Sequence, residues 1–315
     1  MKQTSTVRQI LNSRKAALAA GRDTTDGAHV ALVLEGGGMR GVTSISLACG
    51  LADAGLLNAF DSVHGSSAGA CAAAYFATGQ HELGASIYYE DLVSSEFIDI
   101  KRCLVGRPIM STSFLIDEVM KNRKPLESSK ITSRPGYVNL VLTRAIDGEE
   151  RLVSAYKTAE EIYSYLRATI CIPFVAGPPI KIGADSYFDG GLRQQIAVNS
   201  ALASGATHVL ILMSRREDHL RRKDRTKGFS FEASALRYLY GKPMETIFRQ
   251  RNSGINKILD WCQIGASDTE VAFDYIALHK NTPELGRLTK NKEILYEAYK
   301  IAKQTGFDYL DRSIP

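Results

Sequence analysis

The sequence predicts an α/β fold with a mainly parallel sheet and a helical C-terminal extension, and three observations support this prediction. Short apolar runs alternate with longer segments of helical composition from residue 30 onward. Glycine-rich turns at 36–38 and 65–69 follow the first two of these runs. The 315 residues are 44% hydrophobic and 23% charged, which is the composition of a folded globule with a sizeable core.

The first third of the chain predicts the alternation of strands and helices that a parallel sheet requires. A short helix is expected over 4–20. The apolar run 30–34 predicts a buried strand, and 41–57 predicts a helix. The run 62–64 predicts a second strand, and the small residues of 68–77 predict a helix packed tightly on the sheet. Parallel strands need crossover helices of this kind between them.

The rest of the chain predicts further strands and then mostly helices. Strands are expected at 137–143 and 151–155, joined by the Asp147-Gly148 turn, and a helix capped by Thr158 is expected at 158–167. A strand pair around the turn 183–185 should end at Phe188, and a core strand is expected at 209–213. Helices are expected at 231–240, 244–262 and 290–303, with a last strand at 271–278. We therefore divide the chain into a helical lead-in (1–28), an α/β domain (29–214) and a mainly helical extension (215–315) packed on the same core.

Charge and cysteine content argue against several classes of protein. With 39 Lys and Arg against 34 Asp and Glu, the formal charge of +5 is too small to indicate a nucleic-acid partner. No zinc site or disulfide framework is expected, because no Cys-X-X-Cys occurs among Cys49, Cys71, Cys103, Cys171 and Cys262. No apolar run is long enough to span a bilayer and no secretory signal is expected, so we predict a cytoplasmic location.

The first glycine turn, Gly36-Gly37-Gly38, lies between a predicted strand and a predicted helix. Its backbone amides can face a phosphate or an oxyanion at the N-terminus of that helix. Gly36, Gly38 and Gly41 also fit G-x-G-x-x-G, so dinucleotide binding is an alternative at this point. A dinucleotide site needs an acidic residue after the second strand, whereas Asp61 has the spacing but precedes that strand.

The second turn, Gly65-Ser66-Ser67-Ala68-Gly69, has the form G-x-S-x-G between a strand and a helix. This is the context of a nucleophile elbow, in which a strained turn exposes the serine at the start of the helix. Ser67 is the candidate nucleophile. Without the flanking strand and helix, such a small-residue turn would be equally consistent with a structural role.

The third turn, Asp189-Gly190-Gly191, follows a predicted strand and taken alone would indicate a hairpin. A serine hydrolase needs a base, and the chain has no convincing triad histidine. His64 lies on the strand that enters the elbow, and the others are scattered: His29, His81, His208, His219 and His279. An aspartate held at a strand end by a glycine turn can supply the base instead.

In this order the three turns resemble the patatin-like phospholipase family, over roughly residues 30–204. The resemblance implies a three-layer α/β/α fold in which 29–214 is the catalytic domain, with Ser67 and Asp189 as a catalytic dyad. It implies that Gly36, Gly37 and Gly38 form the oxyanion loop. The residues that complete the three motifs are Arg40, Gly41, Gly65, Gly69, Gly190 and Gly191.

We therefore expect a phospholipase A type of lipid acyl hydrolase that needs no metal or cofactor and releases fatty acid through an acyl-enzyme. A soluble small-ester esterase and a catalytically silent lipid-binding module are the alternatives. Arg40 is either a contact for a lipid phosphate or a structural residue. The candidates for an acyl pocket, which could equally be ordinary core, are Phe97, Ile98, Ile109, Phe114 and Leu115.

If the substrate is a lipid, a basic segment is the candidate contact with an anionic membrane surface. Seven basic residues fall between 215 and 227, namely Arg215, Arg216, Arg221, Arg222, Lys223, Arg225 and Lys227. Such residues are attracted to anionic lipid headgroups. Because Glu217, Asp218 and Asp224 are interspersed, an ordinary solvated loop is the alternative.

Overall fold

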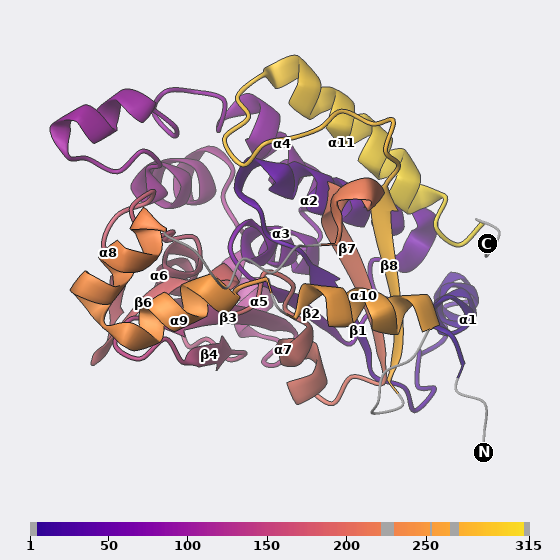
Figure 1. Ribbon diagram of the computed structural model, residues 1–315. Helices are drawn as coiled ribbons and strands as arrows, with labels where there is room; N and C mark the ends of the chain where they lie inside the picture. Colours follow the sequence, from indigo (N-terminus) through magenta and orange to yellow (C-terminus); the bar gives the residue numbers. More distant parts are fainter. Residues whose placement is uncertain (1–4, 222–229, 253, 265–270, 312–315) are drawn as a thin grey trace.

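The computed structural model describes residues 5–221, 230–252, 254–264 and 271–311 and shows an α/β fold around a central sheet (Figure 1). The strand order is β5 (Ile180–Ile182), β6 (Asp185–Asp189), β3 (Val138–Arg144), β2 (Ser62–Gly65), β1 (Val30–Leu34), β7 (His208–Arg216) and β8 (Ala272–Leu278), and β4 (Glu150–Val153) pairs with β3. Parallel ladders join β3, β2, β1, β7 and β8, and antiparallel ladders join β4, β5 and β6 to the sheet. The prediction of a mainly parallel sheet is confirmed.

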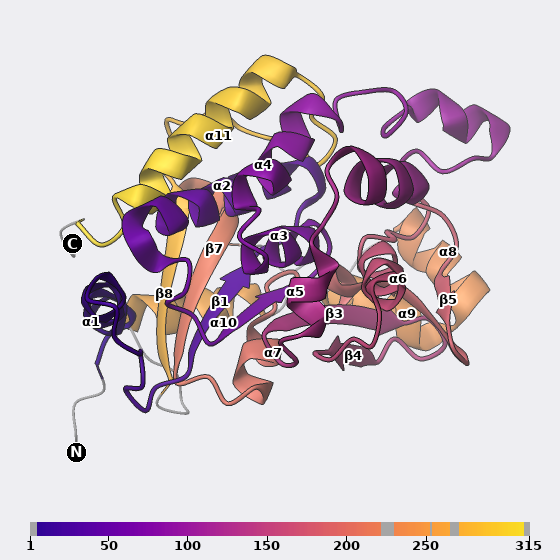
Figure 2. The same cartoon turned by 180° about the vertical axis from the view of Figure 1, so that it is seen from behind.

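Helices cover both faces of this sheet (Figures 1 and 2). One face carries α2 (Gly41–Leu51), α3 (Ala68–Ala77), α4 (His81–Glu90), α6 (Ala159–Thr169) and α11 (Lys292–Phe307), and the other carries α7 (Val198–Ala203) and α10 (Ile255–Ile264). Along β1, Val30, Leu32 and Leu34 join one buried cluster, whereas Ala31 and Val33 join the other. A strand buried on both sides needs a continuous apolar run, and β1 has one. Because helices cover both faces of the sheet, the fold has three layers, α/β/α.

The remaining elements of the described structure are mostly single helices. They are α1 (Val7–Ala19), α5 (Ser128–Thr132), α8 (Phe231–Tyr240), α9 (Lys242–Gln250), the 3-10 helices η1 (Gly38–Arg40), η3 (Ile100–Val105), η5 (Gly190–Leu192) and η6 (Glu217–His219), and the π-helices η2 (Ala52–Leu56) and η4 (Phe114–Arg123). Thr158 caps α6 by accepting a hydrogen bond from the backbone of Glu161, as predicted.

Two predicted helices differ from the observed ones. The helix predicted over 41–57 is α-helical only as far as Leu51 and continues as η2, in which Gly55 has a φ of 85°. The single helix predicted over 244–262 is instead α9 and α10. Asn252 and Gly254, which favour turns, stand between them, and periodicity alone did not reveal this break.

The C-terminal part of the chain belongs to the same core. β8 extends the sheet by pairing with β7, and α11 packs along α2. The two helices approach so closely that a Cβ on Gly50 would lie 2.0 Å from the Lys303 carbonyl oxygen, and one on Gly306 would lie 2.1 Å from that of Leu47. Among the described residues, no helix combines the length and apolar character needed to cross a bilayer.

Candidate active site

Ser67 lies at the sharp turn between β2 and α3. Its backbone has φ 55° and ψ −136°, a conformation that residues other than glycine rarely adopt. A Cβ on Gly65 would lie 2.3 Å from the Gly69 carbonyl oxygen, and one on Gly69 would lie 2.1 Å from that of Leu34. The two glycines are therefore required by close backbone contacts, and the local geometry is that of a nucleophile elbow.

Hydrogen bonds from distant segments hold this turn. The Ser67 amide donates to Thr169 Oγ1 at 3.0 Å, and the Thr169 hydroxyl donates to the Val141 carbonyl at 2.7 Å. The Ser66 hydroxyl donates to the Gln194 carbonyl at 2.6 Å. Thr169 could not be predicted from the sequence as part of the site, because it is the last residue of α6 and belongs to no motif.

Asp189, the last residue of β6, contacts the candidate nucleophile directly. Ser67 Oγ donates to Asp189 Oδ2 at 2.6 Å, and the Gly191 amide donates to Oδ1 at 2.6 Å. The Asp189 side chain is buried, and this burial raises its pKa to about 6, although both hydrogen bonds and the charge of Arg287 oppose the shift. A Cβ on Gly190 would lie 2.0 Å from the Val141 carbonyl oxygen, so the turn after Asp189 also needs glycine.

The glycine loop 36–38 lies against the elbow. A Cβ on Gly36 would lie 2.9 Å from the Ser67 Cβ, and the φ values of Gly37 and Gly38 are 154° and 60°. The Gly36 amide donates to the Gln195 carbonyl at 3.4 Å. Within the described residues, the Gly37 and Gly38 amides have no recorded hydrogen-bond acceptor. Two amide donors thus border the hollow that also contains Ser67 and Asp189.

A buried ion pair anchors the loop from behind. Glu35 is fully buried and Arg215 is 4% exposed; the Arg215 guanidinium donates to Glu35 Oε1 through Nε at 2.8 Å and also through Nη2. The Ser214 amide donates to Glu35 Oε2 at 2.8 Å, and the Ser214 hydroxyl donates to the Gly36 carbonyl at 2.9 Å. The Arg40 guanidinium and the Ser214 hydroxyl both lie next to Gly37, since a Cβ on Gly37 would lie 3.0 Å from each of them.

These contacts correct the prediction for the basic segment. Both the membrane contact and the alternative solvated loop predict Arg215 at the surface, but it is buried because β7 continues to residue 216 and places it beside Glu35. Arg216 pairs with Asp218, and Arg221 pairs with Asp260. The other basic residues of the predicted contact, Arg222, Lys223, Arg225 and Lys227, lie outside the described residues.

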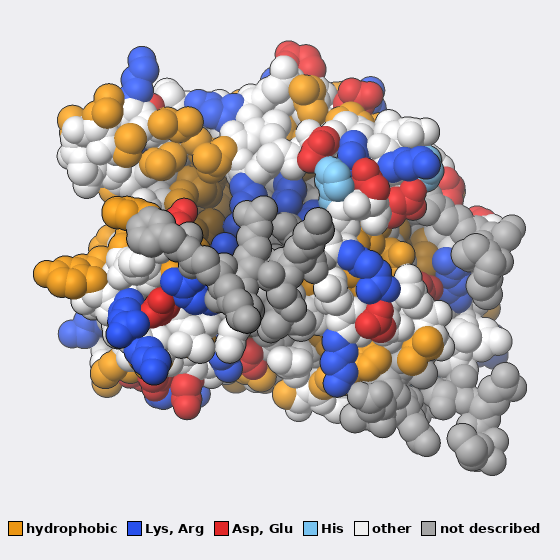
Figure 3. Space-filling model, in the orientation of Figure 1, with side chains coloured by type: hydrophobic (Ala, Val, Ile, Leu, Met, Phe, Trp, Pro, Cys, Tyr) orange, Lys and Arg blue, Asp and Glu red, His pale blue; other side chains and the backbone are white. Residues whose placement is uncertain are grey.

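Ser67 stands where two cavities meet. A wider hollow of about 280 Å³ opens at the surface and contains Asp189, Phe174 and Arg287, and Figure 3 shows this face of the molecule hollowed between two projecting parts. A narrower cavity of about 40 Å³ runs inward from Ser67 between apolar side chains. Its lining residues include Ala68, Cys71, Ala72, Tyr75, Ile87, Phe97, Leu115 and Met120. Of the predicted acyl-pocket residues, Phe97 and Leu115 line it, whereas Ile98, Ile109 and Phe114 do not.

His64 and Asp61 lie outside this site. The His64 ring bonds to the hydroxyls of Ser62 and Ser200, and burial lowers its pKa to about 3, so it is neutral and fully engaged. Asp61, which has the spacing of a dinucleotide-binding acid, precedes β2 and accepts hydrogen bonds from Arg14 and from the Val30 amide. It therefore lies at the opposite end of the parallel strands from the glycine loop.

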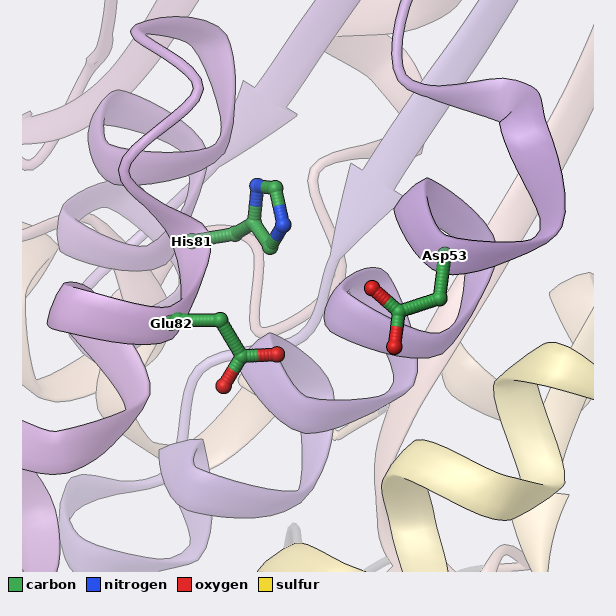
Figure 4. Close-up of side chains that lie close together, drawn as sticks. All are labelled: Asp53, His81 and Glu82. Carbon is green, nitrogen blue, oxygen red and sulfur yellow. The ribbon is translucent and has the colours of Figure 1, made fainter.

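A second cluster contains residue types that bind metals. Figure 4 shows Asp53, His81 and Glu82 turned toward one another, and their ligand atoms lie within 4.8 Å of each other. The Lys303 ammonium lies 2.9 Å from Asp53 and 2.7 Å from Glu82. Because this ammonium already bridges both carboxylates, the cluster fits a structural ion-pair network between α11, α4 and η2 better than a metal site.

One comparison with known protein families matches the segment that contains the three turns. A family model described as patatin-like phospholipase matches residues 32–202, just over half of the chain. Among solved structures, VipD from Legionella pneumophila aligns with a TM-score of 0.40 and 12% sequence identity, covering 90% of this chain and 67% of that one. No curated protein sequence matches significantly.

Proposed function

The chain belongs to the patatin-like phospholipase family, and on this basis we propose that it hydrolyses acyl esters of lipids through an acyl-enzyme on Ser67. The observation that carries the proposal is the 2.6 Å hydrogen bond from Ser67 Oγ to the buried Asp189 carboxylate. It pairs a nucleophile with a base in the absence of a histidine contact. A carboxylate with a pKa near 6 is also a better base at neutral pH than an ordinary aspartate.

The reaction follows from this geometry. Asp189 takes the Ser67 proton while Oγ attacks the acyl carbon, and the Gly37 and Gly38 amides stabilise the oxyanion that forms. When the tetrahedral intermediate collapses, protonated Asp189 gives its proton to the departing alcohol. Water, deprotonated by Asp189, then attacks the acyl-enzyme. When this second tetrahedral intermediate collapses, the bond to Ser67 Oγ breaks, Asp189 returns the proton to Oγ, and the fatty acid leaves. Losing one oxyanion donor typically costs about 3 kcal/mol of transition-state stabilisation.

The two cavities suggest how a substrate lies. The narrow cavity is lined almost wholly by apolar side chains, which suits an acyl chain, and the wider hollow holds Arg287 and suits the polar remainder of the ester. The small volume of the narrow cavity, about 40 Å³, favours a second candidate, an esterase for short acyl groups. Rates measured on esters of increasing acyl length distinguish the two: the lipid hydrolase gains activity with length, and the short-chain esterase loses it.

The pH dependence of hydrolysis should report the ionisation of the Asp189 carboxyl group. The base must be ionised, and its pKa is raised to about 6, so kcat/KM should fall as the pH drops through about 6 and level off above it. Arg287→Gln should move this limb to higher pH, because the Arg287 charge stabilises the carboxylate. The measurement is kcat/KM for a soluble ester between pH 4 and pH 9. A limb near pH 4 would contradict the raised pKa of Asp189, and a limb that Arg287→Gln leaves in place would show that Asp189 is not the titrating base.

Narrowing the apolar cavity should change chain-length preference. Ala72 lines the cavity from α3 and is buried, so Ala72→Leu adds three carbons where an acyl chain would lie. We expect about a 100-fold loss on long-chain esters and less than a threefold change on acetyl esters. A thermal melt controls for folding. An equal loss on all chain lengths would place the acyl chain elsewhere.

A further inference from the structure

Large hydrophobic side chains are exposed on two projecting elements of the structure. On η3 they are Ile100, Leu104 and Val105, and on α8 they are Phe231, Tyr238 and Leu239; Leu104 and Tyr238 are 83% and 89% exposed. Phe174 is also partly exposed, in a positive-φ conformation that is strained for a bulky residue. Figure 3 shows hydrophobic side chains on two projecting parts of this face and in the hollow between them. We call these seven residues the apolar rim.

Both elements border the mouth of the active-site hollow. η3 lies in the loop between Ile98 and Met110, and these two residues form a β-bridge at the base of the loop. The Met110 amide donates to the Val175 carbonyl at 2.9 Å. Val175 lines the hollow beside Phe174. From the other side, Glu232 of α8 lines the same hollow, and the Tyr240 ring packs 5.0 Å from that of Phe188, the neighbour of Asp189. The rim therefore frames the entrance to Ser67.

Basic residues accompany the apolar tip of η3. Between residues 99 and 108 the chain carries Lys101, Arg102 and Arg107 against one acid, Asp99. The Asp99 carboxylate accepts a hydrogen bond from the Lys101 amide and caps η3. Arg287 adds a further positive charge inside the mouth. Exposed apolar side chains next to basic ones are typical of a surface that enters the interface of an anionic bilayer.

We propose that the apolar rim inserts into the headgroup region of an anionic phospholipid bilayer and holds the mouth of the hollow against the lipid. The inference rests on the proposed function, since an acyl ester drawn from a bilayer would then enter the hollow without crossing water. Solvent-facing apolar patches of this kind on a soluble chain mark interaction sites. The surface is distinct from the segment 215–227, whose described basic residues are paired with acids of the same chain.

Vesicle binding tests the rim separately from catalysis. Each variant is made in a Ser67→Ala background and sedimented with vesicles of phosphatidylcholine and phosphatidylserine. Leu104→Asn with Val105→Asn, and Tyr238→Asn with Leu239→Asn, should each weaken binding at least tenfold. The matched control is Ile264→Asn, on a similarly exposed residue at the end of α10, and should change binding less than twofold. Vesicles of phosphatidylcholine alone should bind the parent more weakly.

A fluorescent label locates the inserted element. Cys103 is exposed at the tip of η3, whereas Cys49, Cys71 and Cys171 are buried. An environment-sensitive dye on Cys103 should shift to the blue when vesicles are added, and Cys103→Ser should remove that signal. Absence of binding by the parent, or undiminished binding by both rim variants, would overturn the proposal.

Hydrolysis of a soluble short-chain ester separates failure of the rim from failure of the proposed function. With Ser67 intact, the rim variants should hydrolyse that ester at the parent rate, because they leave the dyad untouched. If the parent binds vesicles through the rim but hydrolyses no ester, the proposed function is wrong and the membrane surface stands.

Discussion

Replacing Ser67 by alanine or Asp189 by asparagine is expected to lower kcat/KM for ester hydrolysis by about 10⁴-fold or more, the range seen when a nucleophile or its base is removed. The two residues act as one unit across the 2.6 Å hydrogen bond, so the double variant should lose little beyond either single change. Asparagine retains the shape of Asp189 and can still accept the Gly191 hydrogen bond, but it cannot take a proton. The measurement is steady-state hydrolysis of a soluble ester.

Active-site labelling provides an independent readout of the nucleophile. A fluorophosphonate should modify Ser67 in the parent, modify it far more slowly in Asp189→Asn, and leave Ser67→Ala unmodified. Thermal melts should show that both variants remain folded. His64→Asn is the matched control, since His64 is near in sequence but engaged with Ser62 and Ser200. Loss of activity in His64→Asn with full activity in Asp189→Asn would refute the dyad.

Replacing Glu35 by alanine is expected to lower the free energy of unfolding by about 3–5 kcal/mol, because it leaves the Arg215 charge buried and unpaired. The same change removes the acceptor of the Ser214 amide and so loosens the support of the glycine loop. Turnover should therefore fall together with stability. Chemical denaturation measures the first effect, and hydrolysis well below the melting temperature measures the second.

A compensating double variant tests the electrostatic explanation. Glu35→Leu with Arg215→Met removes both charges and fills similar space, so most of the lost stability should return. Turnover should stay low, because the Ser214 amide still lacks the carboxylate that orders the loop. A double variant as unstable as Glu35→Ala would mean that packing, rather than the unpaired charge, causes the loss.

The sequence was most informative where the chemistry is local. The residue types of each glycine turn lie within one short segment and so could be recognised, although Gly69 is needed by a contact with Leu34 on the neighbouring strand. The apolar run of β1 likewise reflects burial on both faces. Strand–helix alternation then predicted the parallel sheet. The structure brings Ser67 and Asp189 together, while their catalytic role stays a prediction.

The remaining parts of the site depend on contacts between distant segments. Thr169 reaches the elbow from the end of α6, and Arg287 enters the hollow from a segment beyond the family match. Arg215 stands among many charged neighbours, and only the continuation of β7 beside β1 places it next to Glu35. Local composition cannot distinguish such a buried arginine from a solvated one, and the prediction for it was wrong for that reason.

The contact between Gly50 and Gly306 has a consequence for how this protein can evolve. At both crossings a single methyl group would collide with the backbone of the partner helix, so neither position can accept a larger residue while the other helix keeps its place. The segment shared with the family, 32–202, is thus shorter than the unit that must fold together, since α2 lies inside that segment and α11 lies outside it. Exchange of the segment 32–202 between relatives would therefore succeed only when the incoming α2 is complementary in shape to the α11 that it packs against.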